Sequence, residues 1–89
     1  MKSEKEQPVQ VRPRLGDIQL WLVRQLSEMV NVVPGNIDIK KPFTSYGLSS
    51  REAVSFVGDI EQWLGFELED TLIYDYPNID SLANHLAQL

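Results

Sequence analysis

The apolar residues of the chain fall into groups with helical spacing, separated by segments rich in proline, glycine and asparagine. The first group predicts an amphipathic helix from about Gly16 to Val33. Its apolar positions, three or four residues apart, are Ile18, Leu22, Leu26, Met29, Val30 and Val33. Asp17 suits the positive end of this helix, and Pro34 with Gly35 predicts where it stops.

A long loop follows over residues 34–48. Its length of roughly 15 residues exceeds the usual 2 to 8 of helix connections, so we expect it to do more than join two helices. Five apolar residues predict that it is pinned to a core: Ile37, Ile39, Phe43, Tyr46 and Leu48.

A second helix is predicted from Ser50 to Leu64. Ser49 and Glu52 have the spacing of a capping box, which makes Ser49 the N-cap. The apolar stripe of this helix is Ala53, Phe56, Val57, Ile60 and Leu64. Gly65 is then expected to end the helix in a left-handed conformation.

Two further elements complete the chain. Residues 71–75 form a short element, and a last helix runs from about Ile79 to Ala87 with Asn78 as its N-cap. No segment shows sustained strand alternation. The sequence therefore predicts an all-α fold, a bundle of three main helices and one short helix with a long first loop.

Size and composition exclude several classes of function. A chain of 89 residues folds as one small domain that buries only about 60% of its unfolded surface, which leaves no room for a deep substrate cleft. With no cysteine and a single histidine, His85, we expect no disulfide, thiol nucleophile or metal site. No apolar run approaches the roughly 20 residues that cross a bilayer. We expect a monomeric cytoplasmic protein with no membrane insertion.

Charge is distributed unevenly along the chain. Residues 1–14, which we interpret as a flexible tail, hold four basic and two acidic residues, so residues 15–89, the folded domain, have a net charge of −7 against −5 for the whole chain. After Arg51 there are eight acidic residues and no lysine or arginine. This acidity argues against nucleic acid as a partner. The acidic run is either a solvated face or a surface for basic partners.

Ser50 is the residue with candidate chemistry. It lies at the N-terminus of the second helix, a position that favours phosphate, and Ser49 already serves as the cap. No base lies at a local spacing, and position 52 is Glu where a hydrolase elbow has Gly, so a self-sufficient serine hydrolase is disfavoured. A serine modified by another enzyme and a merely structural serine both remain open.

Three blocks of sequence resemble an acyl carrier protein of the modular polyketide synthase type: Tyr46–Val54, Asp59–Gly65 and Thr71–Ala83. The resemblance covers residues 15–89. It implies a carrier and not an enzyme, with 4′-phosphopantetheine from coenzyme A attached covalently to Ser50. Gly47, Leu48 and Ser49 would surround the attachment point. Acyl groups would then travel as thioesters on the arm, whose thiol replaces the cysteine that the chain lacks.

The resemblance also implies partners. These are a phosphopantetheinyl transferase, an acyl-AMP ligase or acyltransferase, a ketosynthase, and tailoring enzymes of polyketide or fatty acid biosynthesis. The run Ser-Arg-Glu-Ala-Val at residues 50–54 is similar to carriers that receive a fatty acyl starter from an AMP-forming ligase. The second helix would present to these enzymes Arg51, Val54, Ser55, Gly58, Glu61 and Gln62.

Two residues depart from the family's pattern. Ser49 replaces the usual Asp before the modified serine, which keeps a good N-cap but removes a negative charge. Arg51 replaces the usual Leu, and it either changes partner choice or pairs with a nearby carboxylate. Gly58 costs about 1 kcal/mol relative to Ala within a helix, so either a neighbour approaches it closely or the imperfection is tolerated.

Other interpretations remain. The nearest is a peptidyl carrier domain of a nonribosomal peptide synthetase, and another is a helical docking module that binds partners without modification. A helix-turn-helix DNA binder would need basic residues on its recognition helix, where the second helix offers Arg51 alone. Trp63, Tyr74 and Tyr76 favour core packing over an acyl groove, and we expect His85 at the surface or rim.

Overall fold

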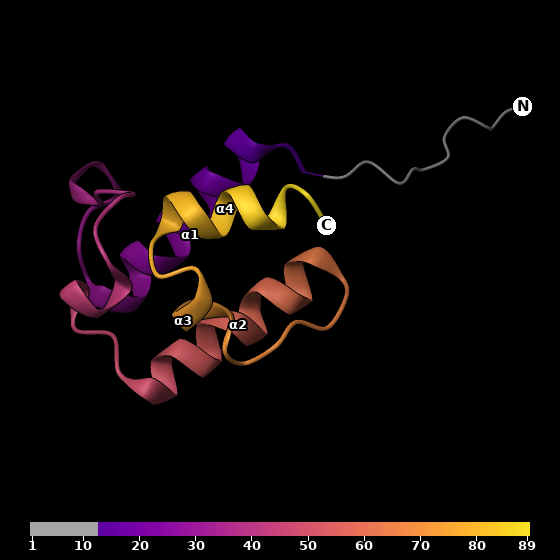
Figure 1. Cartoon of the computed structure of the whole chain (residues 1–89). Helices are drawn as coiled ribbons and strands as arrows, with labels where there is room; N and C mark the ends of the chain where they lie inside the picture. The colour runs from indigo at the N-terminus through magenta and orange to yellow at the C-terminus, as the bar shows by residue number, and fades with distance from the viewer. Residues whose placement is uncertain (1–12) are drawn as a thin grey trace, which may run out of the picture.

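Four α-helices and two short 3₁₀ helices make up residues 13–89, the part of the chain that this computed structural model describes. In order they are α1 (Leu15–Val30), η2 (Pro34–Asn36), η3 (Phe43–Tyr46), α2 (Ser50–Leu64), α3 (Leu72–Asp75) and α4 (Ile79–Leu86) (Figure 1). The all-α prediction of three main helices and one short helix is confirmed. The predicted tail, residues 1–14, lies outside the described residues except for its last two. None of the helices in residues 13–89 has the length and apolar character needed to span a membrane.

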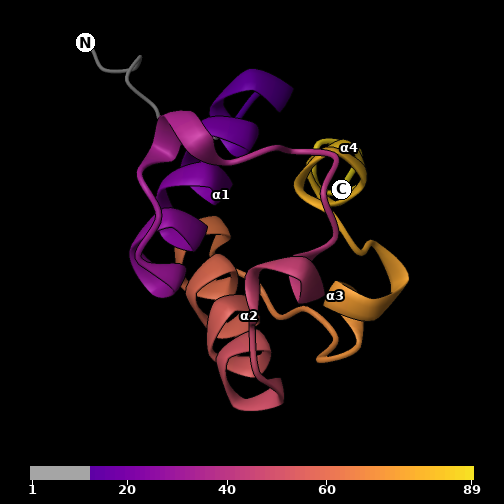
Figure 2. The same cartoon turned by 90° about the vertical axis from the view of Figure 1, so that its left-hand side faces the viewer.

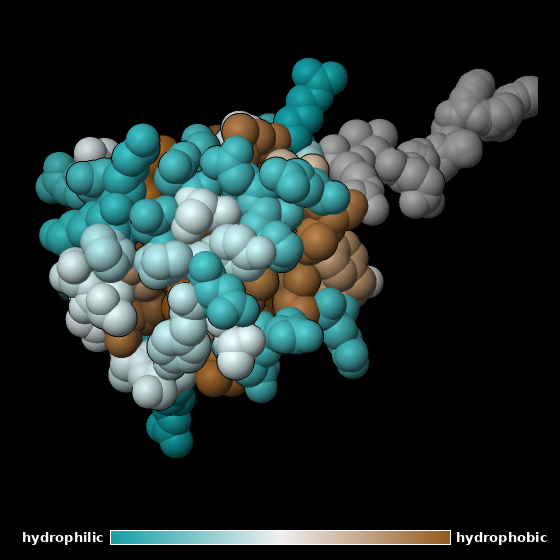
Figure 3. Space-filling view, viewed as in Figure 1, coloured by the Kyte–Doolittle hydropathy of each residue, from teal (hydrophilic) through white to brown (hydrophobic). Residues whose placement is uncertain are grey.

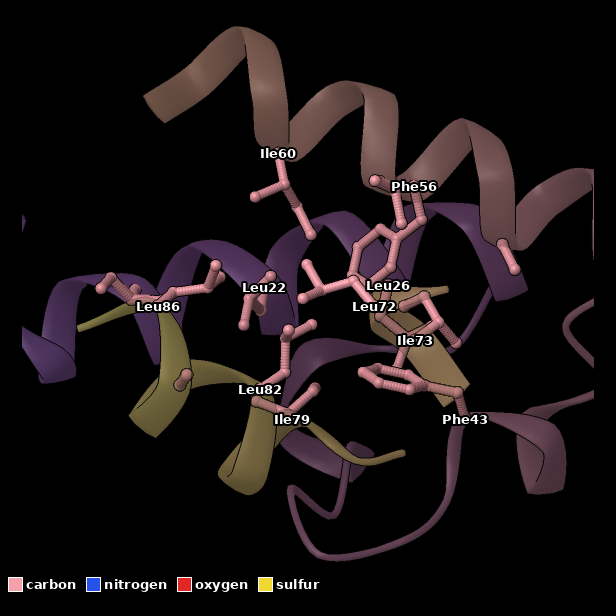
Figure 4. Close-up of a cluster of buried hydrophobic side chains, with 14 residues drawn as sticks. Leu22, Leu26, Phe43, Phe56, Ile60, Leu72, Ile73, Ile79, Leu82 and Leu86 are labelled. Atoms are coloured by element: carbon pink, nitrogen blue, oxygen red, sulfur yellow. The ribbon is translucent and has the colours of Figure 1, made fainter. Parts of the chain in front are cut away.

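One apolar core joins all four helices (Figure 4). Its 14 buried side chains are Ile18, Leu22, Leu26, Phe43, Ala53, Phe56, Val57, Ile60, Leu72, Ile73, Ile79, Leu82, Ala83 and Leu86. The predicted stripe of α2 is buried except for Leu64, which is half-buried. Phe43 and Phe56 meet edge to face with ring centroids 5.6 Å apart, so the loop before α2 is fastened to the helix that it precedes.

The end of α1 differs from the prediction. The helix stops at Val30, three residues before the predicted Val33, because Asn31 adopts a left-handed conformation with φ 59°. Its N–H donates to the Ser27 carbonyl oxygen and closes the last turn. Asparagine tolerates this conformation better than most residues, so Asn31 ends the helix before Pro34 is reached. Val33 is therefore outside the helix and 62% exposed.

The long loop between α1 and α2 is fixed by hydrogen bonds to the junction of α3 and α4. The Phe43 N–H donates to the Pro77 carbonyl oxygen at 2.8 Å, and the Asp80 N–H donates to the Ile39 carbonyl oxygen at 2.9 Å. Figure 2 shows the loop running from α1 past α4 and α3 to α2. These hydrogen bonds fix the position of the loop, and so the point at which α2 begins.

Candidate functional site

The start of α2 is closed by the predicted capping box. The Ser49 hydroxyl accepts a hydrogen bond from the Glu52 N–H at 3.1 Å, and the Glu52 carboxylate accepts one from the Ser49 N–H at 2.9 Å. The Ala53 N–H donates to the Ser49 carbonyl oxygen at 2.8 Å. Both side chains of the capping box are therefore committed to the helix end.

Ser50 stands apart from this network. It is the first residue of α2 and its side chain is exposed. Within residues 13–89 its hydroxyl makes no hydrogen bond, and the N–H groups of Ser50 and Arg51 have no acceptor. The described part of the chain thus leaves one hydroxyl and two amide donors without partners at the positive end of α2.

Gly47 and Leu48 shape the approach to this point. Gly47 ends η3 with φ 78°, and its N–H donates to the Thr44 carbonyl oxygen at 3.1 Å. A β-carbon added at Gly47 would meet no atom within 4 Å, so the positive φ, and not lack of space, calls for glycine here. Leu48, the next residue, is half-buried against the core and so fixes the chain between η3 and α2.

Ser50 borders a hollow of about 180 Å³ between η3, α2 and α3. The apolar part of its wall is Phe43, Leu48, Ala53, Ile73 and Tyr74. Tyr74 is 61% exposed, so the expectation of core packing is wrong for this residue. Trp63 and Tyr76 are half-buried against the core as expected, and Trp63 stacks on Trp21 of α1 with ring centroids 4.5 Å apart.

The predicted partner residues lie along α2, and their exposure differs. Four are exposed and two are half-buried; the exposed ones are Arg51, Val54, Ser55 and Gln62, and the half-buried ones are Gly58 and Glu61. A shallow hollow of about 630 Å³ lies over the C-terminal part of this face, next to Ser55, Gly58 and Gln62. A β-carbon added at Gly58 would meet no atom within 4 Å, so no neighbour within residues 13–89 requires glycine there.

Glu61 has a structural task that sequence reasoning missed. Its carboxylate accepts a hydrogen bond from the Leu68 N–H at 2.7 Å, which ties the loop after α2 back onto the helix. The two residues are seven positions apart across the turn at Gly65, whose φ is 87°. No local sequence pattern predicts this hydrogen bond, because it depends on the path of the loop after α2.

A separate hollow of about 540 Å³ lies near the C-terminal end of α4. Figure 3 shows apolar side chains gathered at the right of the molecule, the side on which α4 ends in Figure 1. His85 and Tyr76 both border the hollow, and their rings stack with centroids 4.1 Å apart, so the expectation of a rim histidine is confirmed. No cluster of three or more residues suited to bind a metal occurs in the described part of the chain.

The family model for the phosphopantetheine attachment site matches residues 20–86, which includes α2 and the loop before it. The chain belongs to this family. This membership confirms the prediction of a carrier domain with covalently attached 4′-phosphopantetheine.

Relatives of this carrier include both synthase domains and small proteins. One large component of the phenolphthiocerol/phthiocerol polyketide synthase from Mycobacterium tuberculosis is 31% identical over 81% of the chain, which spans only 4% of that relative. The acyl carrier protein TtuC of Teredinibacter turnerae is 28% identical over 80% of the chain and 82% of its own length.

Solved structures confirm the acyl-carrier-type fold. Asl1650, an acyl carrier protein from Anabaena sp. PCC 7120 with a variant phosphopantetheinylation-site sequence, is 37% identical with a TM-score of 0.80, over 93% of this chain and 96% of that one. A free-standing peptidyl carrier protein from Acinetobacter baumannii is also 37% identical with a TM-score of 0.80, over 84% and 94%.

Proposed function

We propose that Ser50 is the residue of this carrier that receives 4′-phosphopantetheine. The proposal rests on the different hydrogen bonding of two adjacent serines. Ser49 is engaged in the capping box, whereas the Ser50 hydroxyl is exposed and makes no hydrogen bond within residues 13–89. Of the two, only Ser50 can be modified without removing the cap of α2.

The residues around Ser50 fit a phosphodiester. The two amide donors of Ser50 and Arg51 are unpaired within the same described range and lie where the helix dipole favours an anion. The Glu52 carboxylate, the acid next along the chain, is held by the Ser49 N–H at 2.9 Å. The group thus meets donors at its phosphate, and its remainder can extend into solvent.

The attachment step balances with coenzyme A as co-substrate and a phosphopantetheinyl transferase, with magnesium, as catalyst. The Ser50 Oγ attacks the phosphorus atom that bears the pantetheine half and forms a new P–O bond. The bond from that phosphorus to the adenosine bisphosphate half breaks, and this half leaves with the electron pair. The Oγ proton passes to a base of the transferase, since no side chain within residues 13–89 accepts a hydrogen bond from the Ser50 hydroxyl and the Glu52 carboxylate is bonded to the Ser49 N–H.

When bound, the group supplies the thiol on which acyl intermediates are held as thioesters. We propose that this carrier serves polyketide or fatty acid biosynthesis enzymes, among them a ketosynthase and an acyltransferase or acyl-AMP ligase. Similarity to the mycobacterial synthase supports this class, and the run at residues 50–54 supports loading with a fatty acyl starter by an AMP-forming ligase. A cytoplasmic location and a monomeric state remain predictions from the sequence.

The outer face of α2 is the proposed surface for these enzymes. Arg51, Val54, Ser55 and Gln62 are exposed there, and Gly58 opens space between them. Contacts on such a face should be brief and guided by charge, because a shuttle must leave each partner quickly. Glu61 belongs to this face only in part, since its carboxylate is bonded to the Leu68 N–H.

A peptidyl carrier is the second candidate, favoured by the likeness to the Acinetobacter protein. The two candidates differ in the loading enzyme. An acyl-AMP ligase or acyltransferase would load this chain if it is an acyl carrier, and an amino-acid-adenylating enzyme would load it if it is a peptidyl carrier. Incubation of the modified chain with one enzyme of each kind, followed by intact-mass measurement, separates them.

Attachment itself is tested by co-expression with a broad-specificity transferase and intact-mass measurement. We expect the wild-type chain and Ser49→Ala to gain the mass of phosphopantetheine, and Ser50→Ala to gain none. Circular dichroism shows whether each variant is folded. No gain in the wild-type chain would favour a docking module that acts without modification, and a gain that persists in Ser50→Ala would move the attachment point elsewhere.

A further inference from the structure

Arg51 is a cation without an ion-pair partner within residues 13–89. It is the second residue of α2, its side chain is exposed, and it is the one lysine or arginine between residues 42 and 89. The helix positions three and four residues further on, where a carboxylate could pair with it, are Val54 and Ser55, and the residues at the same distance before it, Gly47 and Leu48, are uncharged and lie outside α2. No ion pair joins its guanidinium to a carboxylate of residues 13–89.

The position of Arg51 is unfavourable for a cation in the unmodified chain. The first turn of a helix carries the positive end of the helix dipole, which favours acids and disfavours bases. The nearest carboxylate in the sequence, that of Glu52, is already bonded to the Ser49 N–H at 2.9 Å. Arg51 therefore has a positive charge at the positive end of α2 without an ion pair to any carboxylate of residues 13–89.

We infer that Arg51 is a positioning residue for the phosphodiester of the arm. This inference rests on the proposed function, because the phosphate is placed beside Arg51 only if it is attached to Ser50. A phosphodiester has one negative charge at neutral pH, and a guanidinium is a strong, planar donor for phosphate oxygens. Modification of Ser50 thus adds to this first turn an anion that, unlike the Glu52 carboxylate, is not already bonded to the Ser49 N–H, and Arg51 holds the base of the arm near the helix.

The inference is tested on the full chain in unmodified and modified forms. The variants are Arg51→Gln, Arg51→Lys and the control Arg24→Gln, which removes an exposed arginine from the middle of α1. Modified protein is made with a transferase and coenzyme A, and intact mass verifies each form. For every variant the change in Tm on modification is measured at low salt and at about 0.5 M salt, where exposed charges are screened.

The change in Tm on modification is the Tm of the modified form minus that of the unmodified form. At low salt we expect this change to be about 2 to 6 °C higher in the wild-type chain than in Arg51→Gln, for a domain of this size. The difference should shrink at high salt. Arg51→Lys should keep part of it, and Arg24→Gln should match the wild-type chain. Equal changes in the wild-type chain and Arg51→Gln would overturn the inference.

Phosphorus NMR of the modified chains gives a direct readout of the contact. The phosphodiester resonance should shift in Arg51→Gln and stay in place in Arg24→Gln. A Tm difference without a phosphorus shift would assign the effect to the helix alone and overturn the inference. So would slower modification of Arg51→Gln without either change, because Arg51 would then act on the transferase.

If Arg51→Gln is modified incompletely, the salt dependence of the wild-type resonance decides. A contact with Arg51 predicts a larger shift with salt than free phosphopantetheine shows, and an equal shift overturns the inference. Failure of the proposed function gives a different result: no chain, wild-type or variant, gains the phosphopantetheine mass at Ser50.

Discussion

The two serines at the start of α2 should separate stability from modification. Ser49→Ala removes the hydroxyl that accepts the Glu52 N–H at 3.1 Å. The helix end is exposed, so water can take the place of the lost acceptor, and the loss should be that of an ordinary N-cap, about 1 kcal/mol. For a domain of this size, that lowers Tm by roughly 4 to 8 °C.

Ser50→Ala should have the opposite profile. Its hydroxyl makes no hydrogen bond within residues 13–89 and its side chain is exposed, so the free energy of unfolding should stay within about 0.5 kcal/mol of the wild-type value. Modification should be lost completely. Ser49→Asp serves as the matched control, because aspartate is an equally good N-cap and restores the residue that is usual in the family.

Urea unfolding followed by circular dichroism measures the first property, and intact mass after treatment with transferase and coenzyme A measures the second. An unchanged midpoint of unfolding in Ser49→Ala, or a shift in Ser50→Ala as large as that in Ser49→Ala, would show that Ser49 is not the cap on which the start of α2 depends. A chain that loses modification in Ser49→Ala but keeps it in Ser50→Ala would exchange the roles of the two residues.

Three further substitutions, one of them with Gln62→Ala as its control, test the packing and the outer face of α2. Gly58→Ala should raise the free energy of unfolding by up to about 1 kcal/mol, since the added β-carbon meets no atom within 4 Å; chemical denaturation checks this, and a loss of stability would show a neighbour that the structure does not contain. Glu61→Ala should lower the free energy of unfolding by about 1 to 2 kcal/mol, because the Leu68 N–H loses its acceptor. The control Gln62→Ala, at an exposed position, should change it by no more than about 0.5 kcal/mol, and urea unfolding of both variants tests this difference. Phe56→Ala should lower the free energy of unfolding by about 3 to 5 kcal/mol, because this side chain is 0% exposed; a smaller effect in thermal unfolding would contradict the core described above.

Local signals in the sequence were sufficient for most of the fold. The capping residues Ser49 and Asn78 and the closing Gly65 were predicted, because each acts on backbone groups within a few positions of itself. The end of α1 was missed for a related reason. Pro34 is a stronger stop signal than Asn31 in the sequence, yet Asn31 comes first and tolerates the left-handed conformation.

Features that depend on the path of the chain could not be predicted. The Phe43 and Pro77 backbone groups meet at 2.8 Å across 34 positions, and nothing near either residue indicates the other. The same holds for the Glu61 carboxylate, whose place in a partner surface was predicted while its bond to the Leu68 N–H was not. Tyr74 was assigned to the core from its apolar neighbours, but α3 is a single turn and turns that side chain outward.

Tandem mass spectrometry of the modified chain locates the attachment point of the arm. After treatment with a transferase and coenzyme A, a peptide that contains residues 49–51 should carry one 4′-phosphopantetheine, with fragment ions that place it on Ser50. An unmodified peptide, under conditions in which another carrier is fully modified, or fragment ions that place the group on Ser49 or Ser55, would show that Ser50 is not the modified residue.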